Sequence, residues 1–204
     1  MPPTVSEFRD LLEAAPLGTI VDEHILAGDS FFFRRTPRAQ VTLESHLQAQ
    51  LGITANQVRL VGSGHAGYSL APDGFPRTFS RASDLDVVVV SDILFDGLWQ
   101  TILRWHYGLP GRRMPAASYD AANRIYWGWI APDRLDVSGL PRSAQIMAVV
   151  EHRTRWFNCF QSISRNPIFA ARAVKGRLYR TWEHARLYHI DSLRALKEAV
   201  VRRE

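Results

Sequence analysis

Apolar residues recur at intervals of three and four along several stretches of the chain, the spacing that places them on one face of an α-helix. Typical start and stop residues flank these stretches: Thr4 and Thr181 are candidate N-caps, Pro37 suits a first helical position, and Pro16 and Gly52 end a helix. The pattern predicts helices over residues 5–15, 37–51, 92–107, 143–163 and 182–202, and a short helix over 21–26.

Runs rich in β-branched and aromatic residues predict strands. Val58–Val61 is a short apolar run that stops at a glycine, and Leu85–Val90 begins between two aspartates; both have the length of buried strands. Aromatic content predicts a strand over 124–130, with residues 135–137 at the end of another and a brief extended piece at 177–180.

This order of elements predicts an α/β protein with an N-terminal helical layer and a C-terminal helical subdomain. We expect residues 1–141 to form the core and residues 142–204 the helical subdomain, the two together making one compact unit of 204 residues. No apolar run approaches the ~20 residues of a membrane span, and the chain does not begin like a signal peptide. The expectation is a cytoplasmic protein without a membrane partner.

Charge is distributed unevenly along the chain. Residues 1–141 hold 12 Lys and Arg against 15 Asp and Glu, whereas residues 142–204 hold 13 against 5. Three aromatic residues, Tyr179, Trp182 and Tyr188, lie among the arginines of this basic third, a composition typical of surfaces that bind RNA. The alternative is a helix that packs through its aromatic residues and exposes its arginines to solvent.

The strongest candidate for chemistry is formed by two predicted strand ends. Gly62, Ser63 and Gly64 follow the first strand and offer backbone N–H groups to an anion, while Asp84 and Asp86 open the second. Alternate strand residues point the same way, so both carboxylates share one face, where they repel unless a cation lies between them. This predicts a site for Mg²⁺ carrying a nucleoside triphosphate; the alternative is an ordinary turn beside two solubilising aspartates.

These residues resemble the motif of the nucleotidyltransferase superfamily related to DNA polymerase β, in which a strand ends in Gly-Ser, a helix follows, and the next strand carries Asp-x-Asp. Gly62-Ser63 and Asp84-Leu85-Asp86 match that motif, although the spacer of twenty residues between Ser63 and Asp84 is longer than in most members. The extra length falls on the loop-like segment 69–80. The resemblance implies a small mixed sheet, Mg²⁺ or Mn²⁺ at Asp84 and Asp86, and a nucleoside triphosphate (NTP) as substrate.

Members of this superfamily use a third carboxylate on a later strand. Asp136, between two apolar residues, is the candidate for that catalytic and metal-binding role, whereas Asp133 follows a proline and is typical of a turn. In the same comparison, a basic residue such as Lys175 or Arg177 adds positive charge at the triphosphate.

The resemblance further implies transfer of a nucleoside monophosphate to an acceptor hydroxyl on RNA or tRNA, on a protein or on a small molecule. Stand-alone bacterial members act in toxin–antitoxin or anti-phage systems, which makes an antitoxin-like protein a candidate partner. Two other hypotheses remain open at this point: a decayed transferase that only binds nucleotide or RNA, and a structural adaptor that works through the basic C-terminal helix.

Overall fold

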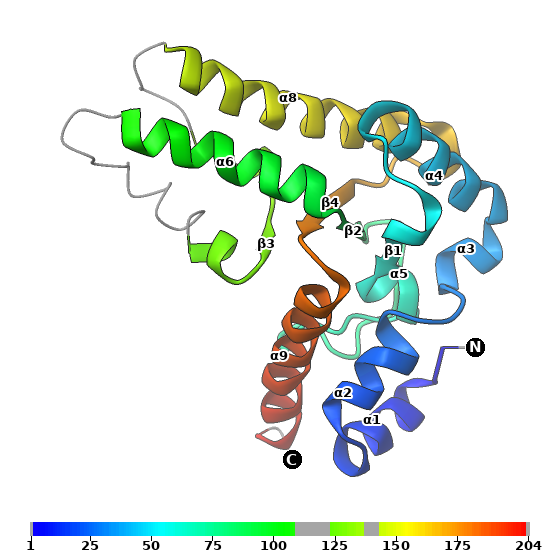
Figure 1. The fold of residues 1–204 in the computed structure, drawn as a ribbon. Coiled ribbons are helices and arrows are strands. Elements are labelled where there is room, and N and C mark those ends of the chain that lie inside the picture. The colour runs from blue at the N-terminus through cyan, green and yellow to red at the C-terminus, as the bar shows by residue number, and fades with distance from the viewer. Residues whose placement is uncertain (1, 109–122, 137–142, 203–204) are drawn as a thin grey trace.

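The computed structural model describes residues 2–108, 123–136 and 143–202 (Figure 1). It shows a mixed α/β protein, which confirms the predicted fold class at this coarse level. Within these ranges no helix combines the length and the apolar content that a membrane crossing requires.

A four-stranded sheet in the order β1-β2-β4-β3 forms the centre of the molecule. The strands are β1 (Val58–Val61), β2 (Leu85–Val90), β3 (Trp129–Ile130) and β4 (Val174–Tyr179). β2 pairs antiparallel with β1 and parallel with β4, and β3 pairs antiparallel with β4. The small mixed sheet is therefore present.

The sequence of β2 is uninterruptedly apolar after Asp86 because both faces of this central strand are buried. Val87 and Val89 belong to one hydrophobic cluster, and Val88 and Val90 belong to the other. Side chains alternate across a strand, so four consecutive valines supply two packing layers at once.

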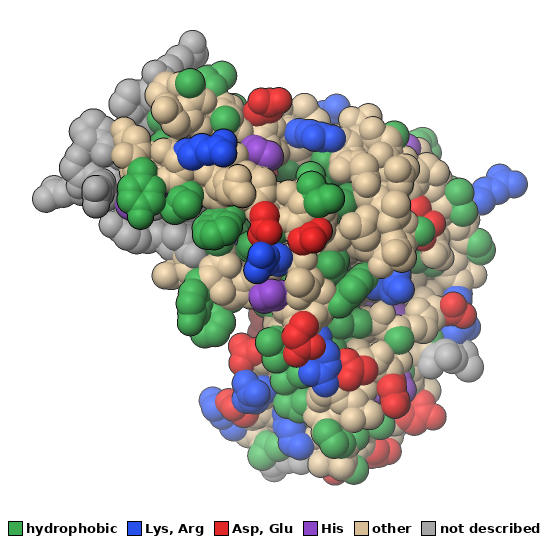
Figure 2. Space-filling view, viewed as in Figure 1, with side chains coloured by type: hydrophobic (Ala, Val, Ile, Leu, Met, Phe, Trp, Pro, Cys, Tyr) green, Lys and Arg blue, Asp and Glu red, His purple; other side chains and the backbone are tan. Residues whose placement is uncertain are grey.

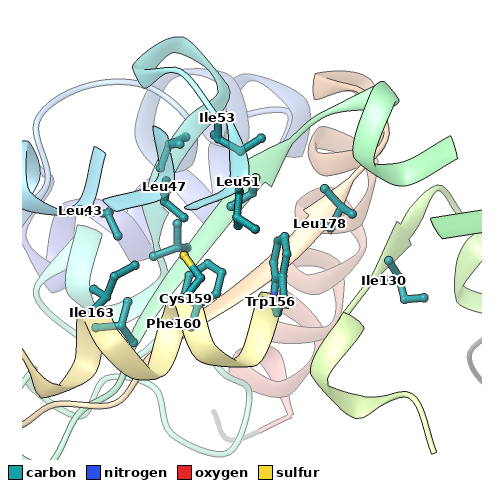
Figure 3. Close-up of a cluster of buried hydrophobic side chains, with 14 of the residues drawn as sticks. Leu43, Leu47, Leu51, Ile53, Ile130, Trp156, Cys159, Phe160, Ile163 and Leu178 are labelled. Atoms are coloured by element: carbon teal, nitrogen blue, oxygen red, sulfur yellow. The ribbon is translucent and has the colours of Figure 1, made fainter. Parts of the chain in front are cut away.

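One layer consists of α4 (Pro37–Leu51), α6 (Asp92–Gly108) and α8 (Ala144–Arg165), which lie together on one side of the sheet (Figure 1). In Figure 3 the leucines of α4 face the buried side of α8, and β4 runs across the same view. The residues that meet there include Leu43, Leu47, Leu51, Trp156, Cys159, Phe160, Ile163 and Leu178.

The other layer consists of α1 (Val5–Ala14), α2 (Leu17–Ile20), the π-helical turn Val21–Ile25 and α9 (Trp182–Val201). Thr4 is the N-cap of α1, as the sequence predicts, and it also forms a reciprocal capping box with Glu7. Other short helices are α3 (Phe31–Arg35), α5 (Gly62–Ala66) and 3₁₀ turns at Ala55–Gln57, Pro132–Arg134 and Pro167–Phe169.

The predicted strand over 124–130 is wrong for most of its length. Residues 123–126 are helical, and only Trp129 and Ile130 pair with β4. Tyr126 and Trp127 are exposed, so the aromatic content that suggested a strand reflects no burial at these positions. Residues 135–136 form no strand either, and residue 137 lies outside the described residues.

The C-terminal part of the chain contributes more than helices. The brief extended piece predicted at 177–180 is the six-residue strand β4, which inserts between β2 and β3. Both parts of the chain on either side of the expected boundary at 141/142 thus share one sheet, and the boundary itself lies outside the described residues.

Gly176 on β4 allows α8 to approach the sheet closely. A Cβ atom at Gly176 would clash with the Phe160 ring, closer than any real contact. We expect Gly176→Ala to lower the free energy of unfolding by about 1–3 kcal/mol, because the ring and strand must move apart. Urea denaturation measures this change.

Gly97 provides the matched control. It lies inside α6, and a Cβ there would meet nothing within 4 Å. Gly97→Ala should be neutral or raise the free energy of unfolding by up to about 1 kcal/mol, the usual gain in helix propensity. Equal destabilisation by both substitutions would contradict the role assigned to the Phe160 contact.

Candidate functional site

A cleft of about 930 Å³ lies at the edge of the sheet where β1 ends and where β2 and β4 begin. Six of the eight residues singled out from the sequence line it together. They are Gly62, Ser63, Asp84, Asp86, Lys175 and Arg177.

Strand pairing explains why the first two motifs meet. β1 and β2 are antiparallel, with Val61 opposite Asp86, so the end of one strand adjoins the start of the other. Gly62 has φ +62°, a left-handed conformation that favours glycine, and a Cβ there would lie 3.3 Å from Oδ2 of Asp86. The turn therefore passes directly beside the carboxylate.

The parallel neighbour β4 brings two cations to the same face. Lys175 is in register with Asp86, and Arg177 with Val88, so both basic side chains lie on the side of the sheet that carries Asp86. The Lys175 ammonium forms an ion pair with Asp84. Both partners remain about half exposed, at 53% and 42%, so this pair contributes little to stability and exchanges readily with other partners.

Arg177 is held more firmly than Lys175. Its guanidinium lies 4.8 Å from the ring centre of Trp129 and 4.5 Å from that of Tyr188. Cation–π contacts of this kind favour a fixed guanidinium orientation. The arrangement presents a permanent positive charge inside the cleft.

Asp86 experiences opposing influences on its pKa. The side chain meets water within the cleft, but protein atoms surround it on its other sides, and this loss of bulk solvent raises its pKa. Arg177 opposes that rise, while Asp84 adds to it. Nearby positive charge therefore favours the ionised form of Asp86.

The inner end of the cleft is formed by β4 and α9. Tyr179 is fully buried, and Tyr188 and His189 from α9 line the wall beside it. Burial, with smaller effects of Arg177 and His65, lowers the pKa of His189 to about 4. Its Nε2 atom is buried and makes no hydrogen bond within the described residues.

Two predicted site residues lie elsewhere. Gly64 is buried between Leu60 and Leu85, where a Cβ would come within 2.8 Å of a Leu85 methyl group, so its position serves packing. Asp136 is exposed and does not line the cleft, whereas Asp133, which the sequence suggested was a turn residue, does.

Several lining residues were not found from the sequence. The loop over residues 69–80 forms one wall and contributes Arg77, and Arg134 lies near enough to influence the pKa of Asp86. The sequence did not single out His189, because it falls on the apolar face of the helical pattern of α9.

The donor set suits a magnesium ion that arrives with a nucleotide. The described residues contain no group of three or more His, Cys, Asp or Glu side chains placed to hold a metal. Mg²⁺ commonly uses one or two carboxylates and takes its other oxygen ligands from substrate phosphates and water. Asp84 and Asp86 meet that requirement.

The basic surface predicted for α9 has a different character. Arg186 pairs with Asp22 and Glu183, and Arg194 pairs with Asp191. Figure 2 shows acidic and basic side chains mixed over the lower part of the molecule, where α1, α2 and α9 lie. With Tyr179 fully buried as well, the aromatic residues named from the sequence do not form one base-stacking surface.

Comparison with protein-family models, with curated proteins and with solved structures finds no significant match to this chain. The geometry of the cleft is therefore the basis for the functional proposal.

His189 makes stability sensitive to acid. Its folded pKa of about 4 lies below the ordinary value of 6.5, so the unfolded chain binds the proton more readily. Stability from this residue is complete above about pH 6.5 and falls as the pH drops towards 4.

We expect His189→Gln to remove up to about 3 kcal/mol of the stability loss between about pH 7 and pH 4.5. Urea denaturation of both proteins at the two pH values measures the difference. An unchanged loss in the variant would show that His189 is not buried in its neutral form.

Proposed function

We propose that this protein is a nucleotidyltransferase that moves a nucleoside monophosphate from an NTP to an acceptor hydroxyl, with Mg²⁺ or Mn²⁺. One observation carries the proposal: a single cleft contains the Gly62-Ser63 turn, the paired carboxylates Asp84 and Asp86, and two cations from β4. Anion donors, metal-type ligands and positive charge at one sheet edge match the needs of a metal–triphosphate substrate.

In the proposed reaction the acceptor oxygen forms a bond to the α-phosphorus, and the bond from that phosphorus to the β-phosphate oxygen breaks. Pyrophosphate leaves with the electron pair, and the hydroxyl proton passes to solvent or to a carboxylate of the cleft. Ser63 and the backbone of Gly62 donate hydrogen bonds to the phosphates, and Arg177 supplies fixed positive charge.

Asp84 and Asp86 hold the divalent ion, which when bound offsets phosphate charge and polarises the acceptor hydroxyl. The exposed ion pair between Lys175 and Asp84 supports this role, because such a pair separates at little cost. Lys175 is then free to contact a phosphate while Asp84 turns to the ion. In the absence of substrate, the positive charge of Lys175 offsets part of the negative charge of the two carboxylates.

The resemblance noted in the sequence extends the proposal to biology. It offers three acceptor classes: RNA or tRNA, a protein, and a small molecule. The same resemblance implies a bacterial, cytoplasmic role in toxin–antitoxin or anti-phage defence. A partner of the antitoxin type belongs to that role. These elements rest on the Gly62-Ser63 and Asp84-Leu85-Asp86 motif.

A second candidate is a protein that binds the metal–nucleotide without transferring it. The strand beside Asp86 carries Lys175 and Arg177 on the cleft face, and the expected third carboxylate, Asp136, lies outside the cleft. A site with fewer carboxylates retains its affinity for triphosphate but has less means to activate the acceptor.

Replacement of both aspartates tests the transferase. We expect Asp84→Asn/Asp86→Asn to lower label transfer from α-labelled NTPs to RNA by at least about a hundredfold, since a bound metal contributes several kcal/mol to such reactions. Asp10→Asn on α1, at an exposed residue that does not line the cleft, serves as the matched control and should keep full activity. Calorimetric NTP binding without any pyrophosphate release would favour the second candidate.

Lys175 gives a separate test of triphosphate binding. Lys175→Gln should raise the dissociation constant for NTP about tenfold, the value of one charge-assisted contact to phosphate. Lys197→Gln, which replaces a lysine of α9 that does not line the cleft, should leave the constant unchanged. Isothermal titration calorimetry gives both values, and equal affinities for the two variants would remove Lys175 from the site.

A further inference from the structure

A second cleft, of about 620 Å³, adjoins the first. Asp133, Lys175 and Gly176 line both, so the two clefts meet at the start of β4. The second cleft continues along α8 towards the turn that follows it, where Arg165 and Arg172 lie. Nothing in the proposed chemistry of the first cleft uses this space.

The floor of the second cleft is aromatic. Trp156 and Phe160 project from α8 towards β4 (Figure 3), and both are almost fully buried. Phe157, the next residue along α8, also lines the cleft but leaves 48% of its surface exposed. The close approach of Phe160 to Gly176 sets the depth of the floor. The exposed phenyl ring of Phe157, beside the buried rings of Trp156 and Phe160, offers a flat surface for a planar ligand.

The rim of the second cleft is positively charged. Arg165 is exposed, and its side chain forms no hydrogen bond or ion pair with the described residues. Arg172 is committed to the fold, because its guanidinium lies 5.1 Å from the Phe79 ring centre and donates to the Ser80 carbonyl. Among the described residues that line this cleft, Asp133 is the one acidic side chain.

The turn at the far end of the cleft is conformationally strained. Ala170 and Ala171 both have positive φ, at 52° and 59°, a backbone region that residues other than glycine rarely occupy. Ala171 lines the cleft itself. Such strain persists where the surrounding structure fixes the backbone, and it is common at binding sites.

We propose that the second cleft binds the end of a single-stranded nucleic acid, which is the acceptor of the transfer reaction. A base stacks on Phe157, and the neighbouring phosphate meets Arg165. Aromatic faces combined with separate cations are the usual means of binding single strands. Every residue of a polynucleotide carries both a planar base and a phosphate, whereas an acidic peptide carries aromatic rings only at particular side chains, so the combination favours a polynucleotide.

This inference rests on the proposed function, because it gives the acceptor hydroxyl its source. The terminal hydroxyl of the strand reaches the first cleft through the junction at Lys175 and Gly176, attacks the α-phosphorus of the NTP, and pyrophosphate leaves. The product is the same strand extended by one nucleoside monophosphate. In this arrangement, basic residues of the 142–204 region on α8 and β4 lie beside the bound strand.

A binding experiment without nucleotide tests the second cleft alone. The probe is a fluorescein-labelled single-stranded RNA of about twelve nucleotides, within the usual range of ~4–16 for such sites, followed by fluorescence anisotropy. We expect Phe157→Ala to weaken binding at least about fivefold, the lower limit for the loss of one stacked base. Arg165→Gln should reduce the slope of log affinity against log salt by about 0.7, the value for one phosphate contact on a single strand.

Conservative variants separate stacking from other effects. Phe157→Tyr should bind like the wild type, whereas Phe157→Leu, which is equally apolar but not planar, should bind as weakly as Phe157→Ala. Trp99→Ala and Arg38→Gln alter an exposed aromatic residue on α6 and an exposed arginine on α4, outside both clefts, and should leave RNA binding unchanged. Thermal unfolding verifies that every variant is folded.

The outcomes distinguish this inference from the proposed function. Weaker RNA binding by Phe157→Ala and a smaller salt slope for Arg165→Gln, with NTP binding retained in both variants, support the second cleft as the acceptor site. Absence of RNA binding by the wild type, or equal binding by wild type and variants, overturns it. If the variants lose RNA binding but the wild type binds no NTP, the nucleic-acid site stands and the nucleotidyl transfer, with the acceptor role, is overturned.

Discussion

The pairing of β2 with β1 on one side and β4 on the other is the constraint on which this structure depends. Antiparallel pairing places the end of β1 beside Asp86, and parallel pairing places the start of β4 there as well. The four valines that follow Asp86 bury both faces of β2, and a shift of one residue would turn each of them into the opposite layer. Packing therefore fixes the register, and the register fixes which side chains enter the cleft.

The same pairing determines the electrostatics of the site. Asp84 and Asp86 share one face, and the reduced contact of Asp86 with bulk water together with their mutual repulsion disfavours two negative charges there. Lys175 and Arg177 compensate because parallel strands bring equivalent residues side by side. One cation is exposed and exchangeable, and the other is fixed against aromatic rings. A metal–triphosphate, which carries both signs of charge, complements such a surface.

Gly176 connects this site to the remainder of the C-terminal part. Its missing side chain admits the Phe160 ring, so α8 lies close against the strand and its aromatic residues reach the edge of the cleft. The helix thus serves the core through Trp156 and Ile163 while Phe157, one position further round the helix than Trp156, remains exposed. A packing contact and the proposed RNA-binding surface therefore come from successive residues of one helix.

The sequence by itself determined the long helices α1, α4, α6, α8 and α9, the two strands β1 and β2, and the expectation that Gly62-Ser63 and the paired aspartates belong together, because these depend on local periodicity and on where apolar runs stop. Only the tertiary structure showed which further aspartate lines the cleft. Asp133 and Asp136 are three residues apart, and only the 3₁₀ turn at Pro132–Arg134 and its packing decide which of them faces the cleft. β4 was underestimated because Gly176 interrupts its apolar pattern, and the second cleft joins residues that no local pattern connects.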